Sequence, residues 1–351
     1  MRMAAGGFGV GVGAAVVGGL VAASPAPAAP SAAYEEPVFI PWSSLLPSFT
    51  TGYEPSSAND CVKGHVNCVR AVIREMERRF EPLAEACDHN AMFSLTYLRT
   101  TEQYLESATQ PGFFTDPAFI NHQDAVFARY YFEAWDAYRS GDVAGTPRAW
   151  QIAFDAADDR TVSGLGNLLL GMSAHINRDL PLVLAEIGLV KPDGSTRKTD
   201  HDKVNEFLNL VMEPLLDEAA ARFDPTVDDA QIDGTTVDET MLLQLLVAWR
   251  EQAWRNAEAI VNAPTEAARQ LVLAEIERVA EIEAHLIVLA TGYSGLNVSG
   301  LLALLTSLGA STTDLLQAQA DRSVNELRGL LGGLFQDPAG VRDAYCAAQQ
   351  S

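Results

Sequence analysis

The chain has 351 residues, of which 48% are hydrophobic and 20% charged, a composition typical of a folded globular protein and unlike that of a disordered one. Its 46 acidic and 24 basic residues give a formal net charge of -22 at pH 7. Proteins bind nucleic acid through clusters of Lys and Arg that displace counterions from phosphates, and this sequence has no such cluster. The composition therefore excludes nucleic acid as a partner and disfavours anionic membrane surfaces.

The first 33 residues have the pattern of a cleaved secretory signal peptide. Arg2 precedes an apolar stretch rich in Gly, Ala and Val, and small residues and prolines follow this stretch. An uncleaved membrane anchor is disfavoured because the stretch is poor in Leu and Ile. No later stretch reads as long and apolar enough to span a bilayer. We therefore expect a secreted or cell-envelope protein with no stable membrane insertion after signal cleavage.

The four cysteines follow this signal, an even number in a chain predicted to be exported, so two disulfides are expected. Residues 69–84 have the period of one continuous helix. At about 1.5 Å per residue, that helix would place Cys68 and Cys87 nearly 30 Å apart, beyond the reach of a disulfide. We favour pairing Cys61 with Cys68 and Cys87 with Cys346. A zinc site or a reactive thiol is the alternative, but no Cys-x-x-Cys spacing supports it.

The rest of the chain has a helical period almost throughout. Residues 34–60 differ, because they contain four prolines and no helical period, and they predict an extended arm. Hydrophobic residues at spacings of three and four predict helices around 69–84, 127–138, 165–176, 204–216, 238–262, 265–291 and 313–334. Strand signals are nearly absent. The sequence predicts an all-α multi-helix bundle over residues 61–292, with a C-terminal helical extension over residues 293–351.

A histidine and an aspartate interrupt the apolar stretch GMSAHINRDLP. His175 and Asp179 share one face of the predicted helix with Leu168 and Met172, so they should point inward. A buried imidazole and carboxylate must be hydrogen-bonded or bound to a metal. Two interpretations remain open. The two side chains pair with each other or with an aromatic hydroxyl group and fix the packing, or they are two ligands of zinc or another divalent metal between facing helices.

The metal interpretation needs further ligands, and three histidines outside this stretch are candidates. They are His89, His122 and His201, and acidic residues stand beside each of them. Asp124 and Asp202 are candidates for the general base that activates a metal-bound water. Both carboxylates also have a structural explanation, since acidic residues near helix starts interact favourably with the helix dipole. The sequence contains no nucleophile elbow, zinc-protease motif or phosphate-binding loop.

Several blocks within residues 40–290 resemble a known family, the secreted actinobacterial family catalogued as domain of unknown function 5995. The blocks are CDHNAMF, GFFTDPAFINHQDAVFARYYFEAW, LLLGMSAHINRDLP, STRKTDHDKVNEFL and WREQAWRNAE. The resemblance implies an all-helical fold and export, and it implies no activity. The five candidate metal ligands lie inside these blocks. The stretch GMSAHINRDLP is also similar to the Gly-x-x-x-His-x-x-x-Asp pattern of zinc-dependent phospholipases C and nucleases, whose other ligands have no match here.

Two functions of different classes follow from these observations. The first is a secreted metal-dependent hydrolase of a phosphoester or lipid-like substrate, with His175 and Asp179 as metal ligands. The second is a non-catalytic exported protein that binds an apolar ligand or a partner in the cell envelope, with the histidines in packing networks. Convergence of the histidines on one cavity beside Asp179 would favour the first, and their dispersal would favour the second.

Overall fold

The computed structural model describes residues 61–350 except residue 62 and the segments 228–236 and 294–337. These ranges are helical, and they contain no strand, only two isolated β-bridges. The predicted signal peptide, the predicted arm and the predicted helix at 313–334 lie outside the described residues. No helix in the described ranges is long and apolar enough to cross a membrane. The predicted all-α class is confirmed.

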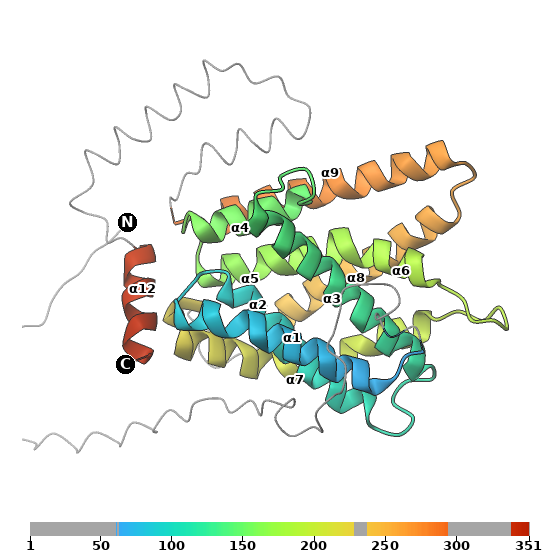
Figure 1. Cartoon of the computed structure of the whole chain (residues 1–351), viewed down its shortest axis with the longest axis horizontal. Coiled ribbons are helices and arrows are strands. Elements are labelled where there is room, and N and C mark those ends of the chain that lie inside the picture. The colour runs from blue at the N-terminus through green and yellow to red at the C-terminus, as the bar shows by residue number, and fades with distance from the viewer. Residues whose placement is uncertain (1–60, 62, 228–236, 294–337, 351) are drawn as a thin grey trace, which may run out of the picture. The chain divides into compact units, whose positions relative to one another are not determined.

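Long helices connected by short loops make up the described chain (Figure 1). They are α1 (Val66–Glu85), α2 (Ala91–Ala108), α3 (Pro117–Ser140), α4 (Arg148–Asp158), α5 (Gly164–Ser173), a π-helical turn η2 (Ala174–Asp179), α6 (Leu180–Ile187), α7 (Lys198–Arg222), a 3-10 turn η3 (Pro225–Val227), α8 (Val237–Val261), α9 (Glu266–Thr291) and α12 (Pro338–Gln349).

Helix α2 lies at the centre of the bundle and packs against α1, α5 and α7. Almost all of its residues are buried, including several polar ones. The hydroxyl groups of Thr96, Thr100 and Thr101 each donate to the carbonyl oxygen four residues earlier, which satisfies them inside the helix. Arg99 donates from Nε and Nη2 to the carboxylate of Glu218 in α7, at 2.8 and 2.9 Å. These contacts let a helix with many polar residues occupy the core.

Helices α5 and α6 belong to one helical segment that changes geometry at η2. Ser163 begins the segment as N-cap, since its hydroxyl accepts a hydrogen bond from the Gly166 N–H. Pro181 has no N–H, and its ring would clash with the carbonyl group four residues earlier in a regular helix. A wider π-helical turn before the proline relieves that conflict. The turn carries His175 and Asp179, and both are buried, as the sequence predicts.

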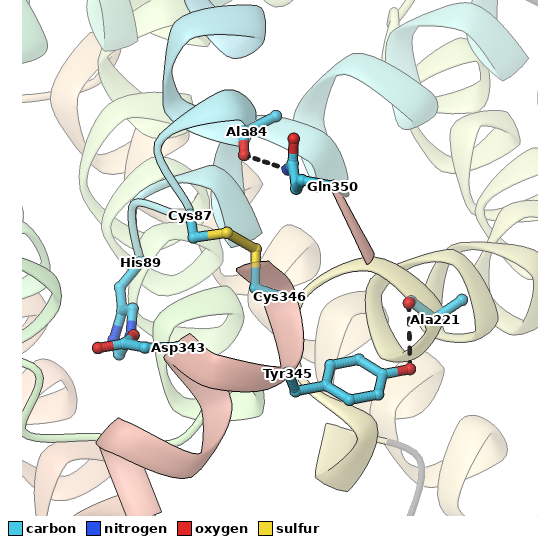
Figure 2. Close-up of a disulfide and its surroundings, with 8 residues drawn as sticks. All are labelled: Ala84, Cys87, His89, Ala221, Asp343, Tyr345, Cys346 and Gln350. Atoms are coloured by element: carbon cyan, nitrogen blue, oxygen red, sulfur yellow. Dashed lines mark hydrogen bonds and ion pairs between the residues drawn. A yellow bond between two sulfur atoms is a disulfide. The ribbon is translucent and has the colours of Figure 1, made fainter. Parts of the chain in front are cut away.

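Both predicted disulfides, Cys61–Cys68 and Cys87–Cys346, are present. The second attaches α12 to Cys87, the second residue after the end of α1, as Figure 2 shows. Two hydrogen bonds hold the same helix, from the Tyr345 hydroxyl to the Ala221 carbonyl and from the Gln350 amide to the Ala84 carbonyl. The C-terminal helix is therefore fixed to the bundle at several points.

Candidate functional site

A cavity of about 110 Å³ lies in the interior of the bundle, between α2, α3, η2, α7 and α8. Its walls are mainly aromatic and aliphatic. The apolar lining includes Phe93, Tyr97, Tyr104, Ile120, Phe127, Met172, Ile176, Val204, Phe207, Leu208 and Leu246. An engineered cavity of about 150 Å³ in another protein holds benzene, so this smaller cavity limits a ligand to about the size of one aromatic ring.

His175 lines this cavity from the π-helical turn. Its Nδ1 lies 2.9 Å from Oδ2 of Asp179, whose carboxylate also accepts hydrogen bonds from Trp150 Nε1 and Arg178 Nη1, each at 2.9 Å. A carboxylate held by two other donors accepts the Nδ1–H of the imidazole, which leaves Nε2 without a proton. The ring stacks on Phe127, with centroids 3.4 Å apart.

The free nitrogen of His175 faces an environment that keeps it neutral. Burial lowers the pKa of His175, and the hydrogen bond and charge of Asp179 oppose this effect without reversing it. Nε2 is buried and accepts no hydrogen bond from the part of the chain that the structure describes. It is therefore a base or acceptor whose orientation is fixed by Asp179 and whose capacity is unused.

Two further polar atoms with unused capacity belong to residues that line the same cavity, Oε1 of Gln123 and Oδ2 of Asp124. Both atoms are buried and have no hydrogen-bond partner among the described residues. Asp124 as a whole is only half-buried, but burial of its carboxyl group raises the pKa of Asp124 to about 8. The carboxyl group is therefore protonated at neutral pH and can donate a hydrogen bond.

Several other polar groups in the lining are already satisfied. The threonine hydroxyl groups of α2 donate within their own helix, and the Tyr104 hydroxyl donates to Oδ1 of Asn121 at 2.5 Å. The unused atoms of His175, Gln123 and Asp124 thus come from α3 and η2, and most of the wall around them is apolar. Such a wall with a few polar groups is the usual form of a small-molecule site.

His89 lies in a different region, beneath α12 (Figure 2). Its Nε2 lies 2.9 Å from Oδ1 of Asp343, and its Nδ1 lies 3.1 Å from Nη1 of Arg342. Arg342 also donates to Asn167 at 2.7 Å. Burial lowers the pKa of His89, and the charge of Arg342 adds to this effect. Both ring nitrogens are occupied in a network that joins the C-terminal helix to the bundle.

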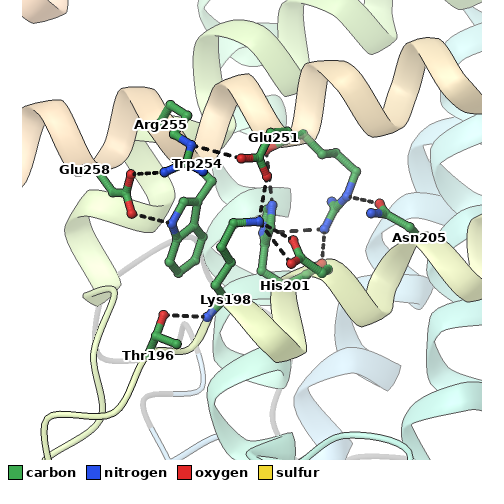
Figure 3. A network of polar contacts seen from close by, with 10 residues as sticks. Thr196, Lys198, His201, Asn205, Glu251, Trp254, Arg255 and Glu258 are labelled. Carbon is green, nitrogen blue, oxygen red and sulfur yellow. Dashed lines mark hydrogen bonds and ion pairs between the residues drawn. The ribbon is translucent and has the colours of Figure 1, made fainter.

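His201 is buried in α7, and it contacts α8. Its Nε2 donates to the Arg250 carbonyl at 3.2 Å, and Nη2 of the same arginine lies 3.4 Å from Nδ1. Burial lowers the pKa of His201 well below its usual value, and the charge of Arg250 adds to this effect. Figure 3 shows the imidazole among Lys198, Asn205 and neighbouring side chains of α8.

The remaining two candidates lie away from these contacts. His122 is half-buried on α3 and Asp202 is exposed on α7, where its carboxylate pairs with Lys198 at 2.8 Å. Neither lines the cavity. Of the candidate site residues, the structure brings His175 and Asp124 to one cavity, with Asp179 behind His175, and it places His89, His122, His201 and Asp202 elsewhere. Across the described ranges, no group of three or more His, Cys, Asp or Glu side chains could hold a metal ion.

Sequence reasoning missed two residues of the cavity, Gln123 and Arg250. Gln123 stands directly beside Asp124, yet nothing in a single glutamine distinguishes a cavity wall from a surface. Arg250 lies four residues after Leu246, so a helical-face argument on α8 could have placed the guanidinium group inside.

A larger groove of about 750 Å³ lies between α6, α8 and α9 and contrasts with the cavity. Its charged side chains have partners. Arg178 pairs with Glu277 at 2.8 Å, and the Tyr130 hydroxyl donates to Glu186 at 3.0 Å. Volume alone therefore does not identify the site, and the unused polar atoms favour the smaller cavity.

Residues 69–290 match a family of unknown function (DUF5995). These residues include every helix that lines the cavity. No curated protein and no solved structure matches the chain.

Proposed function

We propose, for a chain that belongs to the family of unknown function DUF5995, that its interior cavity binds a small, largely apolar ligand carrying a hydroxyl group. The two disulfides suit an oxidising compartment, and the proposal therefore keeps the exported protein predicted from the sequence. The ligand is bound without a metal ion in this proposal.

The observation that carries the proposal is the set of unused polar atoms on residues lining one cavity. A buried donor or acceptor without a partner costs about 1–3 kcal/mol, and native proteins contain few of them. A hydroxyl group can donate to Nε2 of His175 and accept from the protonated carboxyl group of Asp124. A single ligand group would thus remove two of these penalties, while the apolar walls contribute through burial of the ligand's surface.

Phenol and toluene test this proposal because they have nearly the same size and differ in the hydroxyl group. Calorimetry should show that the wild-type protein binds phenol at least about tenfold more tightly, which corresponds to about 1.4 kcal/mol. His175→Leu should abolish the preference, since the acceptor is lost. His89→Leu, which alters a buried histidine in the other network, should retain it. If neither phenol nor toluene binds, or if His175→Leu still prefers phenol, the proposal is overturned.

The second candidate function is a metal-dependent hydrolase, and one observation favours it. Metal-bound histidines usually donate their other ring N–H to a carboxylate, which is the relation of His175 to Asp179. Nε2 of His175 would then be the ligand, with the carboxylate of Asp124 as a second one from the same cavity. His89, His122 or His201 would have to move in order to complete the shell.

Elemental mass spectrometry on exported protein purified without a histidine tag tests this candidate. Stoichiometric zinc or another divalent metal in the wild type, lost in His175→Ala, would support the hydrolase and would replace the metal-free proposal. Absence of metal from both proteins would contradict it.

A further inference from the structure

Arg250 is a buried cation in the wall of the same cavity. Its side chain comes from α8 and is 5% exposed. Nε donates to Oδ1 of Asn205 at 2.8 Å, and Nη2 donates to the His201 carbonyl at 2.6 Å. Both acceptors are neutral. Nη1 makes no hydrogen bond with the described residues, and no carboxylate among them lies within ion-pair distance of the guanidinium group.

Other buried arginines of the chain have acidic partners. Arg99 pairs with Glu218 and Glu102, both at 2.8 Å, and Nε of Arg342 lies 3.7 Å from Oδ2 of Asp224. Buried charges in proteins are normally paired in this way, because a charge removed from water without a partner is costly. The environment of Arg250 therefore lacks the negative charge that accompanies the other buried arginines among the described residues.

Arg250 nevertheless keeps its charge. Burial lowers the pKa of Arg250 to about 10, which leaves the group protonated at neutral pH. The carboxylate of Asp202 opposes this effect from a distance, but its direct partner is Lys198. With His175 neutral and Asp124 protonated, the ionisable side chains that line the cavity carry a net charge of one positive unit.

We propose that Arg250 binds a carboxylate of the ligand, so that the occupant of the cavity is a small hydroxyaryl carboxylate. This inference rests on the proposed function, which supplies the hydroxyl contact at His175 and Asp124. A guanidinium group donates in a geometry that matches the two oxygens of a carboxylate. One positive charge balances a monoanion, whereas a phosphate dianion would leave a negative charge buried. The aromatic lining fits an aryl ring between the two polar ends.

The isosteric pair para-hydroxybenzoate and para-hydroxybenzamide tests the charge, since they share shape and hydroxyl group. Calorimetry at neutral pH should show that wild-type protein binds the benzoate at least about tenfold more tightly. Arg250→Met should remove this preference and leave binding of the amide, while Arg250→Lys should retain part of it. The matched control is Arg255→Met, which removes the same charge from an exposed position on the same helix and should leave the preference unchanged.

The outcomes separate the two proposals. Equal affinity of the wild-type protein for the benzoate and the amide would overturn the carboxylate assignment and leave the proposed function standing. A preference for the benzoate over the amide that survives in Arg250→Met would also overturn the carboxylate assignment. Failure of phenol, benzoate and amide alike to bind would overturn both proposals. The wild-type comparison remains decisive even if Arg250→Met does not fold.

Discussion

His89 and His175 are almost equally buried, at 4% and 3% exposure, yet their surroundings differ in one respect. Both nitrogens of His89 have partners, and its partner Asp343 also pairs with Arg160 at 2.7 Å. His175 uses one nitrogen to contact Asp179 and leaves the other without a partner in the described chain. The first region is a closed network under a disulfide-bonded helix, and the second is a cavity wall.

The comparison teaches that unused hydrogen-bonding capacity, and not the presence of histidine and carboxylate, distinguishes a site from a packing contact. Closed polar networks specify structure, because each member satisfies another. An open network in an apolar cavity is a cost to the unliganded protein and a source of affinity for a ligand. Substitutions in the two regions should therefore have separable effects on stability and on ligand binding.

The largest effect is expected from Asp124 in the cavity region. Its folded-state pKa of about 8 lies above the unfolded value near 4, so its stabilising contribution is complete below about pH 4 and is lost by about pH 8. Over about four pH units at about 1.4 kcal/mol each, the loss reaches at most about 6 kcal/mol. The free energy of unfolding should therefore fall less steeply with rising pH in Asp124→Asn than in the wild type. Urea unfolding at several pH values would measure this difference. Both proteins contain the same buried histidines, so their contribution cancels when the two are compared at each pH. If the free energies of unfolding of the two proteins change in parallel with pH, Asp124 is ionised at neutral pH.

In the closed region, the Cys87–Cys346 disulfide should stabilise the fold without affecting ligand binding. It joins residues 259 apart, so replacing both cysteines with alanine should cost about 2–5 kcal/mol in denaturant unfolding, through the entropy of the unfolded chain. Replacing Cys61 and Cys68, which lie 7 residues apart, provides the control and should cost less. Phenol binding should survive in both variants at temperatures where they fold. Loss of binding in the first variant would mean that the two regions are coupled.

His89→Leu and His175→Leu are matched substitutions of buried histidines. His89→Leu removes partners from Asp343 and Arg342 and should cost about 1–3 kcal/mol. His175→Leu should cost less, because Asp179 keeps Trp150 and Arg178 and an unpartnered atom disappears. Thermal and urea unfolding of the ligand-free proteins would rank them. The reverse order would show that His175 belongs to a packing network, contrary to its assignment to the cavity.

The sequence predicted those features that depend on local periodicity or on covalent reach. Helices α1 and α7 have regular apolar stripes, and the length of one helix excluded a Cys68–Cys87 disulfide, so that the favoured cysteine pairing is confirmed. The inward orientation of His175 and Asp179 followed from their spacing. Helix α2 was not predicted, because a helix buried on nearly all sides has no polar face to define a stripe.

The cavity itself was beyond sequence reasoning. Asp124 was singled out as a candidate base, but its unpartnered oxygen depends on which side chains from other helices come within reach. The same holds for Arg250, whose lack of an acidic partner is a property of several helices together. A π-helical turn was equally invisible, since the sequence around Pro181 is compatible with a kinked α-helix.

Asp202 should show the smallest effect. Its side chain is 49% exposed, and Lys198 would keep Glu251, at 2.6 Å, as a partner after Asp202→Asn. Exposed ion pairs contribute about 0–1 kcal/mol, so the free energy of unfolding should change by less than that amount. Phenol affinity should also be unchanged, because Asp202 does not line the cavity.

A general base of a metal-dependent hydrolase behaves differently, since its removal slows the reaction by about 10²–10⁴. If hydrolysis of any phosphoester is found, a rate loss of this size in Asp202→Asn would move the site from the cavity to the surface of α7, whereas an unchanged rate would leave Asp124 as the carboxyl group to test.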